Sequence, residues 1–336
     1  MRPSAANRLW LGAAAFALAA LLCVPAPLAA QGTGATRQDR NRARPYFDPP
    51  RETTTVSATA LYSWAAYLLE GVERPAAVFA GNAELASKEL LEAQEAQLAA
   101  ATAFVYYGGE GDGWLGEEFA SHGTARRPVV RLGDEGSTAR GHEWLDPVKA
   151  RDAVRRLAAE LKQLHPARVT VIDKNAQALD EELRTLDEWA RRELTPFQGS
   201  AVYLERPGLE PFLERYGLAV AGYLSSTFGN EGEQADADRL AADARQRTGP
   251  LLMLRRPGQL PIPMIRLSQQ VPIRFILVDP IESGEARPAH YVRQMRQNVL
   301  NVVVGLTAAQ SIPASFTPAP EATAATEDEA EDGGEE

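Results

Sequence analysis

The feature that most constrains this chain is a long amphipathic helical pattern that begins after His165-Pro166. Its apolar residues recur at alternating spacings of four and three, which places them on one stripe of an α-helix. Thr195-Pro196 ends the pattern, because proline removes a backbone hydrogen bond of a helix. At about 1.5 Å per residue, such a helix is long enough to cross a whole lobe. The stripe consists of Ile172, Ala176, Leu179, Leu183, Leu186 and Ala190.

Short apolar runs alternate with helical patterns on both sides of this helix. Buried strands followed by covering helices produce such an alternation, so it predicts parallel sheets packed against helices. The predicted fold class is therefore α/β, with two βα lobes joined by one long rigid helix. The predicted strands are residues 53–57, 76–80, 103–107, 128–132, 199–203, 218–223, 249–254 and 273–278. The predicted helices besides the long one are residues 58–71, 83–101, 113–121, 148–164, 209–215, 236–248, 262–270 and 289–306.

The same patterns predict how the chain divides into parts. The predicted parts are a signal peptide (1–30), a flexible leader (31–52), an N-terminal lobe (53–165), the linking helix (166–195), a C-terminal lobe (196–310) and a disordered acidic tail (311–336). The tail is predicted to be disordered because it is rich in acids, Pro, Ala and Thr and poor in large apolar residues.

The N-terminus is typical of a secretory signal. Arg2 and Arg8 provide positive charge, residues 9–24 form an apolar core, and residues 25–30 supply small residues for cleavage. We therefore expect an exported protein of the periplasm or cell envelope. Cys23 is the one cysteine of the chain, so signal removal would leave no thiol for a disulfide. A lipid-modified Cys23 is the alternative, and it would anchor the protein to a membrane.

Charge is distributed unevenly along the chain. The formal net charge is -10, but residues 317–336 carry eight acids and no base, which leaves the rest close to neutral. No segment forms the basic surface that nucleic acid requires, so we expect no nucleic-acid partner.

Motifs for catalysis are missing from the sequence. The chain has no G-x-S-x-G, no cysteine beyond the signal peptide, and no closely spaced histidine pair of the H-E-x-x-H type. We therefore expect no catalytic residues and a protein that is not an enzyme. His122, His165 and His290 are expected at the surface rather than in a site.

Gly111-Asp-Gly-Trp-Leu-Gly116 fits the dinucleotide pattern G-x-G-x-x-G. Glu110 and Asp112 would repel a pyrophosphate, and the segment follows the third predicted strand rather than the first. A plain glycine-rich loop is the favoured interpretation.

His142 and Asp279 are the candidate ligand-binding residues. His142 precedes a helix that begins at Asp146-Pro147, and Asp279 ends the last predicted strand. Ligands of open α/β sheets bind at the carboxyl ends of strands, where a histidine and an aspartate that converge would suit a divalent cation. The alternative is that His142 caps local structure and that Asp279 begins a turn before Pro280.

Four segments resemble the substrate-binding proteins of zinc and manganese ABC transporters. Gly141-His-Glu-Trp-Leu-Asp-Pro147 is similar to that family's D-P-H-x-W-L-D-P motif, with Arg-Gly in place of the leading Asp-Pro. Arg215-Tyr-Gly-Leu218, Leu277-Val-Asp-Pro-Ile281 and Arg293-Gln-Met-Arg-Gln-Asn298 resemble three further family segments. The resemblance covers residues 53–307 and implies a ligand cleft between the two lobes.

The resemblance implies a metal site of three histidines and one carboxylate, or two of each. His142 and Asp279 stand at matching positions. In the first ligand loop Ser87 stands near the family's histidine, and Glu84 is close enough to supply a carboxylate instead.

Other departures put basic residues in the implied cleft. Arg206 stands near a missing histidine, and Arg255 stands where the family has a glutamate. Arginine does not bind Zn²⁺, and its guanidinium competes for carboxylates. Trp144 is the further residue that we place in this cleft.

The leading hypothesis is a monomeric receptor that captures Zn²⁺ or Mn²⁺ as cargo and delivers it to a membrane permease of an ABC transporter. One alternative keeps the fold but binds an anion or a metal chelate through Arg206 and Arg255. Another is an envelope interaction module that binds no metal, with its cleft closed by an Arg206–Asp279 pair.

Overall fold

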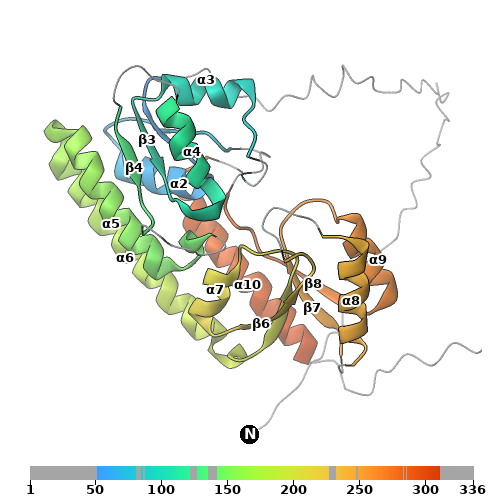
Figure 1. Cartoon of the computed structure of the whole chain (residues 1–336). Coiled ribbons are helices and arrows are strands. Elements are labelled where there is room, and N and C mark those ends of the chain that lie inside the picture. The colour runs from blue at the N-terminus through green and yellow to red at the C-terminus, as the bar shows by residue number, and fades with distance from the viewer. Residues whose placement is uncertain are drawn as a thin grey trace, which may run out of the picture. The chain divides into compact units, whose positions relative to one another are not determined.

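The computed structural model contains two parallel four-stranded sheets that follow one another along the chain (Figure 1). It describes residues 51–80, 85, 88–121, 127–134, 142–226, 232–246, 249–282, 284 and 286–310. Several predictions concern residues outside these ranges: the signal peptide with Cys23, nearly all of the leader, Glu84, Ser87, His122, Gly141 and the acidic tail.

Both sheets have the same strand order, in which the first strand is flanked by the second and the third, and the fourth follows the third. All pairings are parallel. The first sheet contains β1 (Thr54–Val56), β2 (Ala76–Ala77), β3 (Ala103–Tyr106) and β4 (Val129–Arg131). The second contains β5 (Ala201–Leu204), β6 (Ala219–Tyr223), β7 (Leu251–Arg255) and β8 (Ile273–Leu277). These repeated βα patterns confirm the predicted α/β fold class with two lobes.

Helices cover the sheets as the alternation predicted. Around the first sheet lie α2 (Thr59–Leu68), α3 (Glu92–Ala100) and α4 (Gly109–Ser121). After the second sheet begins, the chain forms α7 (Glu210–Tyr216), α8 (Gln234–Ala244), α9 (Ile262–Gln270) and α10 (His290–Gln310). The exact limits of the two lobes along the chain stay a prediction.

The predicted long helix is present as α6 (Val169–Leu194), and it lies beside α5 (Pro147–Leu164) (Figure 1). Asp146 caps α5 by accepting a hydrogen bond from the backbone N–H of Val148, at 2.8 Å. Most of the α6 stripe is buried, and α6 packs against α2 as well as α10. The helix therefore joins elements of both lobes into one core. Short 3-10 helices precede, connect and follow α5 and α6 along the chain: η2 (Glu143–Leu145), η3 (Pro166–Arg168) and η4 (Thr195–Phe197).

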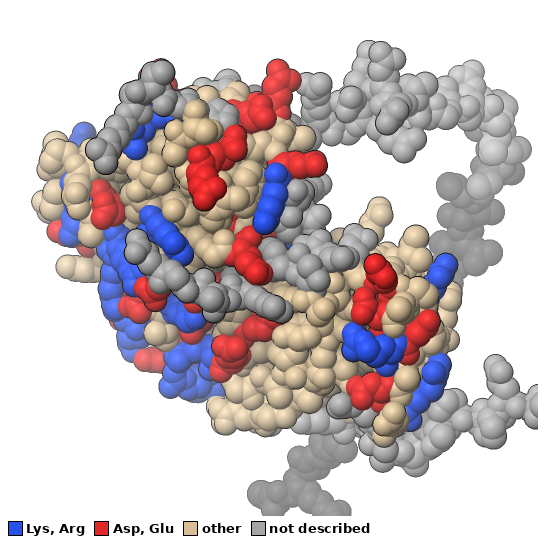
Figure 2. Space-filling model, viewed as in Figure 1, with Lys and Arg blue, Asp and Glu red and all other residues tan. Residues whose placement is uncertain are grey.

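The outer faces of α5 and α6 carry interleaved basic and acidic side chains (Figure 2). Arg151 pairs with Asp180 across the two helices at 2.7 Å, and Arg184 pairs with Glu181 along α6 at 2.5 Å. The exposed Arg184–Glu181 pair contributes little to stability, whereas the half-buried Arg151–Asp180 pair adds to the contact between the apolar faces of α5 and α6. No helix among the described residues combines the length and hydropathy needed to span a membrane.

Two predicted helix starts were wrong. The helix predicted from residue 83 begins at Glu92, because Lys88 has a left-handed φ of 53° and Leu91 is extended. The helix predicted from residue 113 begins earlier, at Gly109, so the glycine-rich segment is helical rather than a loop. A glycine suits Gly116 because a Cβ there would lie 2.7 Å from the Tyr106 ring.

Candidate metal centre

His142 enters a buried position at the junction of the two lobes, immediately before η2. Its backbone N–H donates to the carbonyl oxygen of Gly208 at 3.2 Å, and its ring stacks on Trp144 with centroids 4.5 Å apart. Trp144 is itself fixed, because its Nε1 donates to the carbonyl of Pro280 at 2.7 Å. The hydroxyl of Tyr291 donates to the Trp144 carbonyl at 2.5 Å. The D-P-H-x-W-like motif thus forms a rigid support for the imidazole.

The imidazole of His142 meets a carboxylate from the other lobe. Nε2 of His142 lies 2.5 Å from Oε1 of Glu282, and Nη2 of Arg256 lies 2.5 Å from the same oxygen. His142 and Glu282 are each only 1% exposed. Burial alone would raise the pKa of Glu282, but the charges and hydrogen bonds of His142 and Arg256 outweigh burial and hold that pKa well below its usual range.

Asp279 supports the turn that carries Glu282. Its Oδ1 accepts a hydrogen bond from the backbone N–H of Ile281 at 2.8 Å. Ile281 has φ 58°, a left-handed conformation that is strained for a β-branched residue. Asn298 of α10 fixes the backbone of Asp279 from both sides, accepting from its N–H at 2.9 Å and donating to its carbonyl at 2.7 Å. Burial raises the pKa of Asp279.

The same turn caps helix α2 of the first lobe. The first N–H groups of a helix have no partner within the helix. Thr59 N–H donates to the carbonyl of Glu282, and Ala60 N–H donates to that of Ile281, both at 3.1 Å. A shift of this turn would therefore disturb both the Glu282 side chain and the start of α2.

A second buried carboxylate, Asp112, lies on the first-lobe side of His142. It accepts hydrogen bonds from the hydroxyl of Ser57 at 2.5 Å and from the backbone N–H groups of Tyr107 and Gly108 at 2.8 and 2.6 Å. Burial raises its pKa, although these hydrogen bonds and the nearby His142 act in the opposite direction. The Asp112 carboxylate therefore already accepts the backbone N–H groups of this strand-to-helix turn. A dinucleotide phosphate would need the same N–H groups, so this turn does not suit a dinucleotide.

The two predicted cleft arginines both lie close to this junction. Arg206 is 8% exposed and, with His142, Arg255 and Arg256, lines a cavity of about 10 Å³. That volume is about the minimum for one water molecule. Nη2 of Arg255 donates to the carbonyls of Gly258 and Gln259, at 2.8 and 3.1 Å. Arg255 therefore supports its own loop.

The structure brings together only part of the predicted site. His142, Asp279, Trp144, Arg206 and Arg255 all lie at the junction, whereas Glu84 and Ser87 lie outside the described residues. Among the described residues, no three histidine or acidic side chains are grouped closely enough to hold a metal ion ready-made.

The predictions from the sequence omitted one residue of this junction and placed another wrongly. Glu282 was not proposed, although it follows Asp279 by three positions and the strand-end rule that selected Asp279 also covers it. His290 was expected at the surface but is 6% exposed, and its Nδ1 lies 3.3 Å from Nη2 of Arg293.

Residues 55–305 match the family described as zinc-uptake complex component A, periplasmic. No curated protein matches the sequence significantly.

Solved structures share the fold at low sequence identity. The binding protein FpvC of Pseudomonas aeruginosa, in complex with Mn²⁺, superposes with a TM-score of 0.67 at 16% identity, covering 77% of this chain and 99% of that one. ZnuA gives a TM-score of 0.65 at 18% identity, with 76% and 98% covered. The periplasmic zinc-binding protein TroA of Treponema pallidum gives 0.64 at 19% identity, with 76% and 99% covered.

Proposed function

Because the chain belongs to the family of periplasmic zinc-uptake components, we propose that it is an exported binding protein that captures a divalent metal ion for an ABC importer. The cargo is Zn²⁺ or Mn²⁺, and the partner that receives it is a membrane permease. The protein acts as a monomer that binds and releases, and not as an enzyme. The observation that carries this proposal is the meeting of His142 with Glu282 across the lobe junction.

An imidazole and a carboxylate are suitable ligands for these metals. Two ligands about 2.1 Å from a tetrahedral zinc ion are roughly 3.4 Å apart. Nε2 of His142 and Oε1 of Glu282 are 2.5 Å apart, so the junction must open by about 1 Å to admit an ion. Asp279 supplies a further carboxylate nearby, and Glu84 and Ser87 remain the proposed contributors from the first ligand loop.

Arg256 sets the affinity in this proposal. Its guanidinium contacts Oε1 of Glu282, the oxygen that also faces His142, and arginine cannot coordinate the ion itself. A metal that binds this oxygen together with His142 therefore has to replace Arg256 there. Because this exchange costs an ion pair, we expect weaker binding than in a site without the arginine.

Isothermal titration of metal-depleted protein with Zn²⁺ and Mn²⁺ tests the proposal. We expect measurable binding by the wild type and its loss in His142→Ala and Glu282→Gln. Arg256→Met should bind about tenfold more tightly, because the competing cation is gone. The exposed Arg192→Met is the matched control and should leave affinity unchanged. The proposal is contradicted if neither metal gives heat with the wild type or with Arg256→Met. It is also contradicted if His142→Ala binds metal as tightly as the wild type.

A second candidate function follows from the cavity of about 10 Å³ beside His142. In this alternative, the contacts of Glu282 with His142 and Arg256 close the junction permanently, and the protein is an envelope interaction module. The closing contact would be Arg256–Glu282 rather than the Arg206–Asp279 pair suggested by sequence. The interaction-module function is favoured if no metal gives heat in the titrations and if Glu282→Gln strongly lowers the free energy of unfolding.

Binding of an anion or metal chelate through Arg206 and Arg255 has less support. Nη2 of Arg255 already donates to two carbonyls of its own loop, which leaves fewer N–H donors for an anion. A thermal-shift screen with oxyanions and chelates tests this alternative, and stabilisation by bare cations alone counts against it.

Export and anchoring are separate parts of the proposal. Mass spectrometry of the mature N-terminus distinguishes cleavage near residue 30 from a lipid-modified Cys23.

A further inference from the structure

Two segments that are far apart in the chain are tied together at both of their ends, beside His142. At one end, the backbone N–H of His142 donates to the carbonyl of Gly208 at 3.2 Å. At the other end, Nε of Arg215 lies 3.6 Å from Oδ1 of Asp146. These contacts form a closed frame in which the first segment carries the imidazole and the second contains α7. We call this frame the α7 brace, and it consists of residues 142–146 and 208–215.

Both segments of the α7 brace are short and internally bonded. In the first, the N–H of Asp146 donates to the carbonyl of Glu143 at 3.0 Å. In the second, the N–H of Gly208 donates to the Glu210 carboxylate at 2.6 Å, and α7 begins there. Because α7 has only seven residues, its ends lie about 10 Å apart. The brace therefore has little freedom to bend between its two ends.

Asp187 of the long helix α6 anchors the brace. It is 7% exposed, and its two oxygens accept hydrogen bonds from Nε of Arg215, at 2.8 Å, and from Nη2 of the same guanidinium. Two parallel N–H donors on one carboxylate fix the orientation of both groups. The Tyr216 hydroxyl adds a longer contact with Asp187, at 3.5 Å. One guanidinium thus joins α6, α7 and the start of α5.

We propose that Arg215 is a positioning residue for His142, and that it holds the imidazole where it meets Glu282. A guanidinium does not coordinate metal, so Arg215 acts through the two ends of the brace at Gly208 and Asp146. A ligand already held in place loses less conformational entropy when the ion binds. In assigning this position to metal binding, the inference rests on the proposed function.

A second ion pair allows positioning to be separated from simple stabilisation. Arg151 of α5 donates from Nε and Nη2 to the two oxygens of Asp180 on α6, at 3.2 and 2.7 Å. This pair has the same chemistry as Arg215–Asp187 and uses the same long helix, but it is not part of the α7 brace. Loss of either arginine should lower stability, whereas only loss of Arg215 should move His142.

NMR of the metal-depleted mature protein tests the positioning without requiring a metal. The imidazole of His142 stacks on Trp144 with centroids 4.5 Å apart, so the indole ring current shifts its Cε1–H resonance. The chain has four histidines, and loss of one resonance in His142→Gln assigns the signal. We expect Arg215→Gln to shift this resonance and Arg151→Gln to leave it in place.

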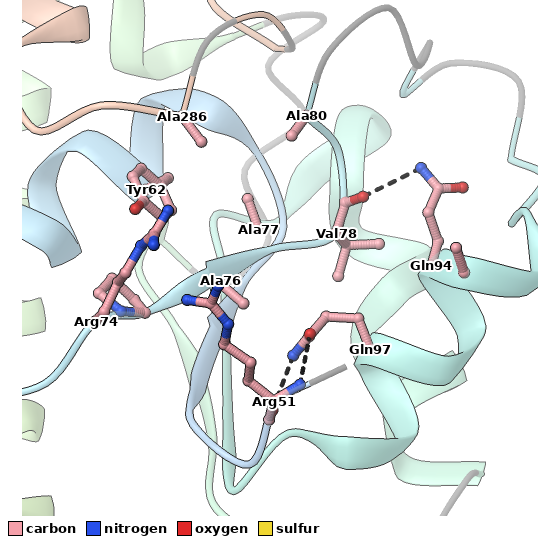
Figure 3. Close-up of a pocket in the computed structure, with 12 residues that line it drawn as sticks. Arg51, Tyr62, Arg74, Ala76, Ala77, Val78, Ala80, Gln94, Gln97 and Ala286 are labelled. Carbon is pink, nitrogen blue, oxygen red and sulfur yellow. Dashed lines mark hydrogen bonds between the residues drawn. The ribbon is translucent and has the colours of Figure 1, made fainter. Parts of the chain in front are cut away.

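A further control lies in the first lobe, beside the cavity that Figure 3 shows. Gln97 of α3 accepts a hydrogen bond from the Arg51 N–H at 3.0 Å and donates to the Arg51 carbonyl at 3.1 Å (Figure 3). Gln97→Ala should lower the free energy of unfolding and leave the His142 resonance unchanged. If Arg215→Gln does not fold, Arg215→Lys replaces it, because lysine keeps the charge but not the two parallel N–H groups. It should still shift the resonance.

Isothermal titration with Zn²⁺ measures the consequence for binding. Arg215→Gln should raise Kd about tenfold, as residues that orient metal ligands typically do, and Arg151→Gln should bind as the wild type does. The positioning role is overturned if the Arg215 variants leave the His142 resonance unchanged, or if the Arg151 and Gln97 variants shift it as far. It is also overturned if the resonance shifts without a rise in Kd. If the wild type binds no Zn²⁺, the proposed function fails for that metal, and the NMR comparison still decides whether Arg215 positions His142.

Discussion

Asp112 and Glu282 are buried carboxylates that approach His142 from the two lobes, and their surroundings differ in kind. Asp112 is 0% exposed and is held by a hydroxyl and two backbone N–H groups. Glu282 is 1% exposed and contacts an imidazole and a guanidinium. Burial dominates at Asp112 and raises its pKa, whereas the cationic partners dominate at Glu282 and lower its pKa.

The two carboxylates are thus stabilised in the interior by different partners. Hydroxyl and backbone N–H dipoles satisfy the oxygens of Asp112, so removing one donor leaves the others in place. Glu282 balances positive charge, so its removal leaves that charge buried and unbalanced. We therefore assign Asp112 a role in fixing the start of α4, and Glu282 a role in joining the lobes and, in the proposed function, in binding metal.

The largest expected effect is that of Glu282→Ala. Removing one partner of a buried charged pair typically costs about 3–5 kcal/mol. We expect a loss of that size in the free energy of unfolding, measured with urea on metal-depleted protein. A loss below about 1 kcal/mol, the range of exposed ion pairs, would contradict the assignment.

Asp112→Asn should cost less, about 1–3 kcal/mol. The amide nitrogen of asparagine cannot accept a hydrogen bond, so at least one of the donors now facing Asp112 loses its acceptor. The same urea titration measures the effect. An effect as large as that of Glu282→Ala would remove the distinction between the two carboxylates.

Ser57→Ala should cost about 1 kcal/mol, because one hydrogen bond is lost and the two backbone donors to Asp112 remain. Thermal unfolding of this variant beside Asp112→Asn measures their difference. If Ser57→Ala is the more damaging of the two, the hydroxyl rather than the carboxylate organises the α4 turn.

The smallest expected effect is a change with pH. A raised folded-state pKa means that the contribution of Asp112 is fully present below its unfolded pKa, roughly pH 4, and is lost as pH rises through the folded value. The groups facing it are Ser57, the N–H groups of Tyr107 and Gly108, and His142. The stability difference between wild type and Asp112→Asn should therefore shrink above pH 4. A difference that grows with pH would reverse the assigned direction.

Local patterns in the sequence were sufficient for most of the fold. The alternating spacings from Ile172 to Ala190 predicted α6, and the apolar runs predicted all eight strands of the two sheets. The motif around His142 indicated the family, and the match over residues 55–305 confirms it. These features depend on residues close together in the chain, so periodicity and short motifs report them directly.

The sequence was less informative about element ends. The helix α3 begins nine residues after its predicted start, because the left-handed conformation at Lys88 outweighs good helical composition. The start of α4 depends on a buried Asp112 whose donors Ser57 and Tyr107 directly follow β1 and β3. Such conformations follow from packing, and composition alone does not encode them.

By itself the sequence determined the two-lobed α/β fold, the long linking helix and the placing of His142 beside Trp144 in the candidate site. Only the tertiary structure decided which carboxylate meets His142. Glu282 lies 140 positions further along the chain and reaches the imidazole through a strained turn at Ile281, which Asp279 and Asn298 hold in place. A contact between residues so distant in sequence is fixed by the packing of two sheets on shared helices, and no local spacing records that packing.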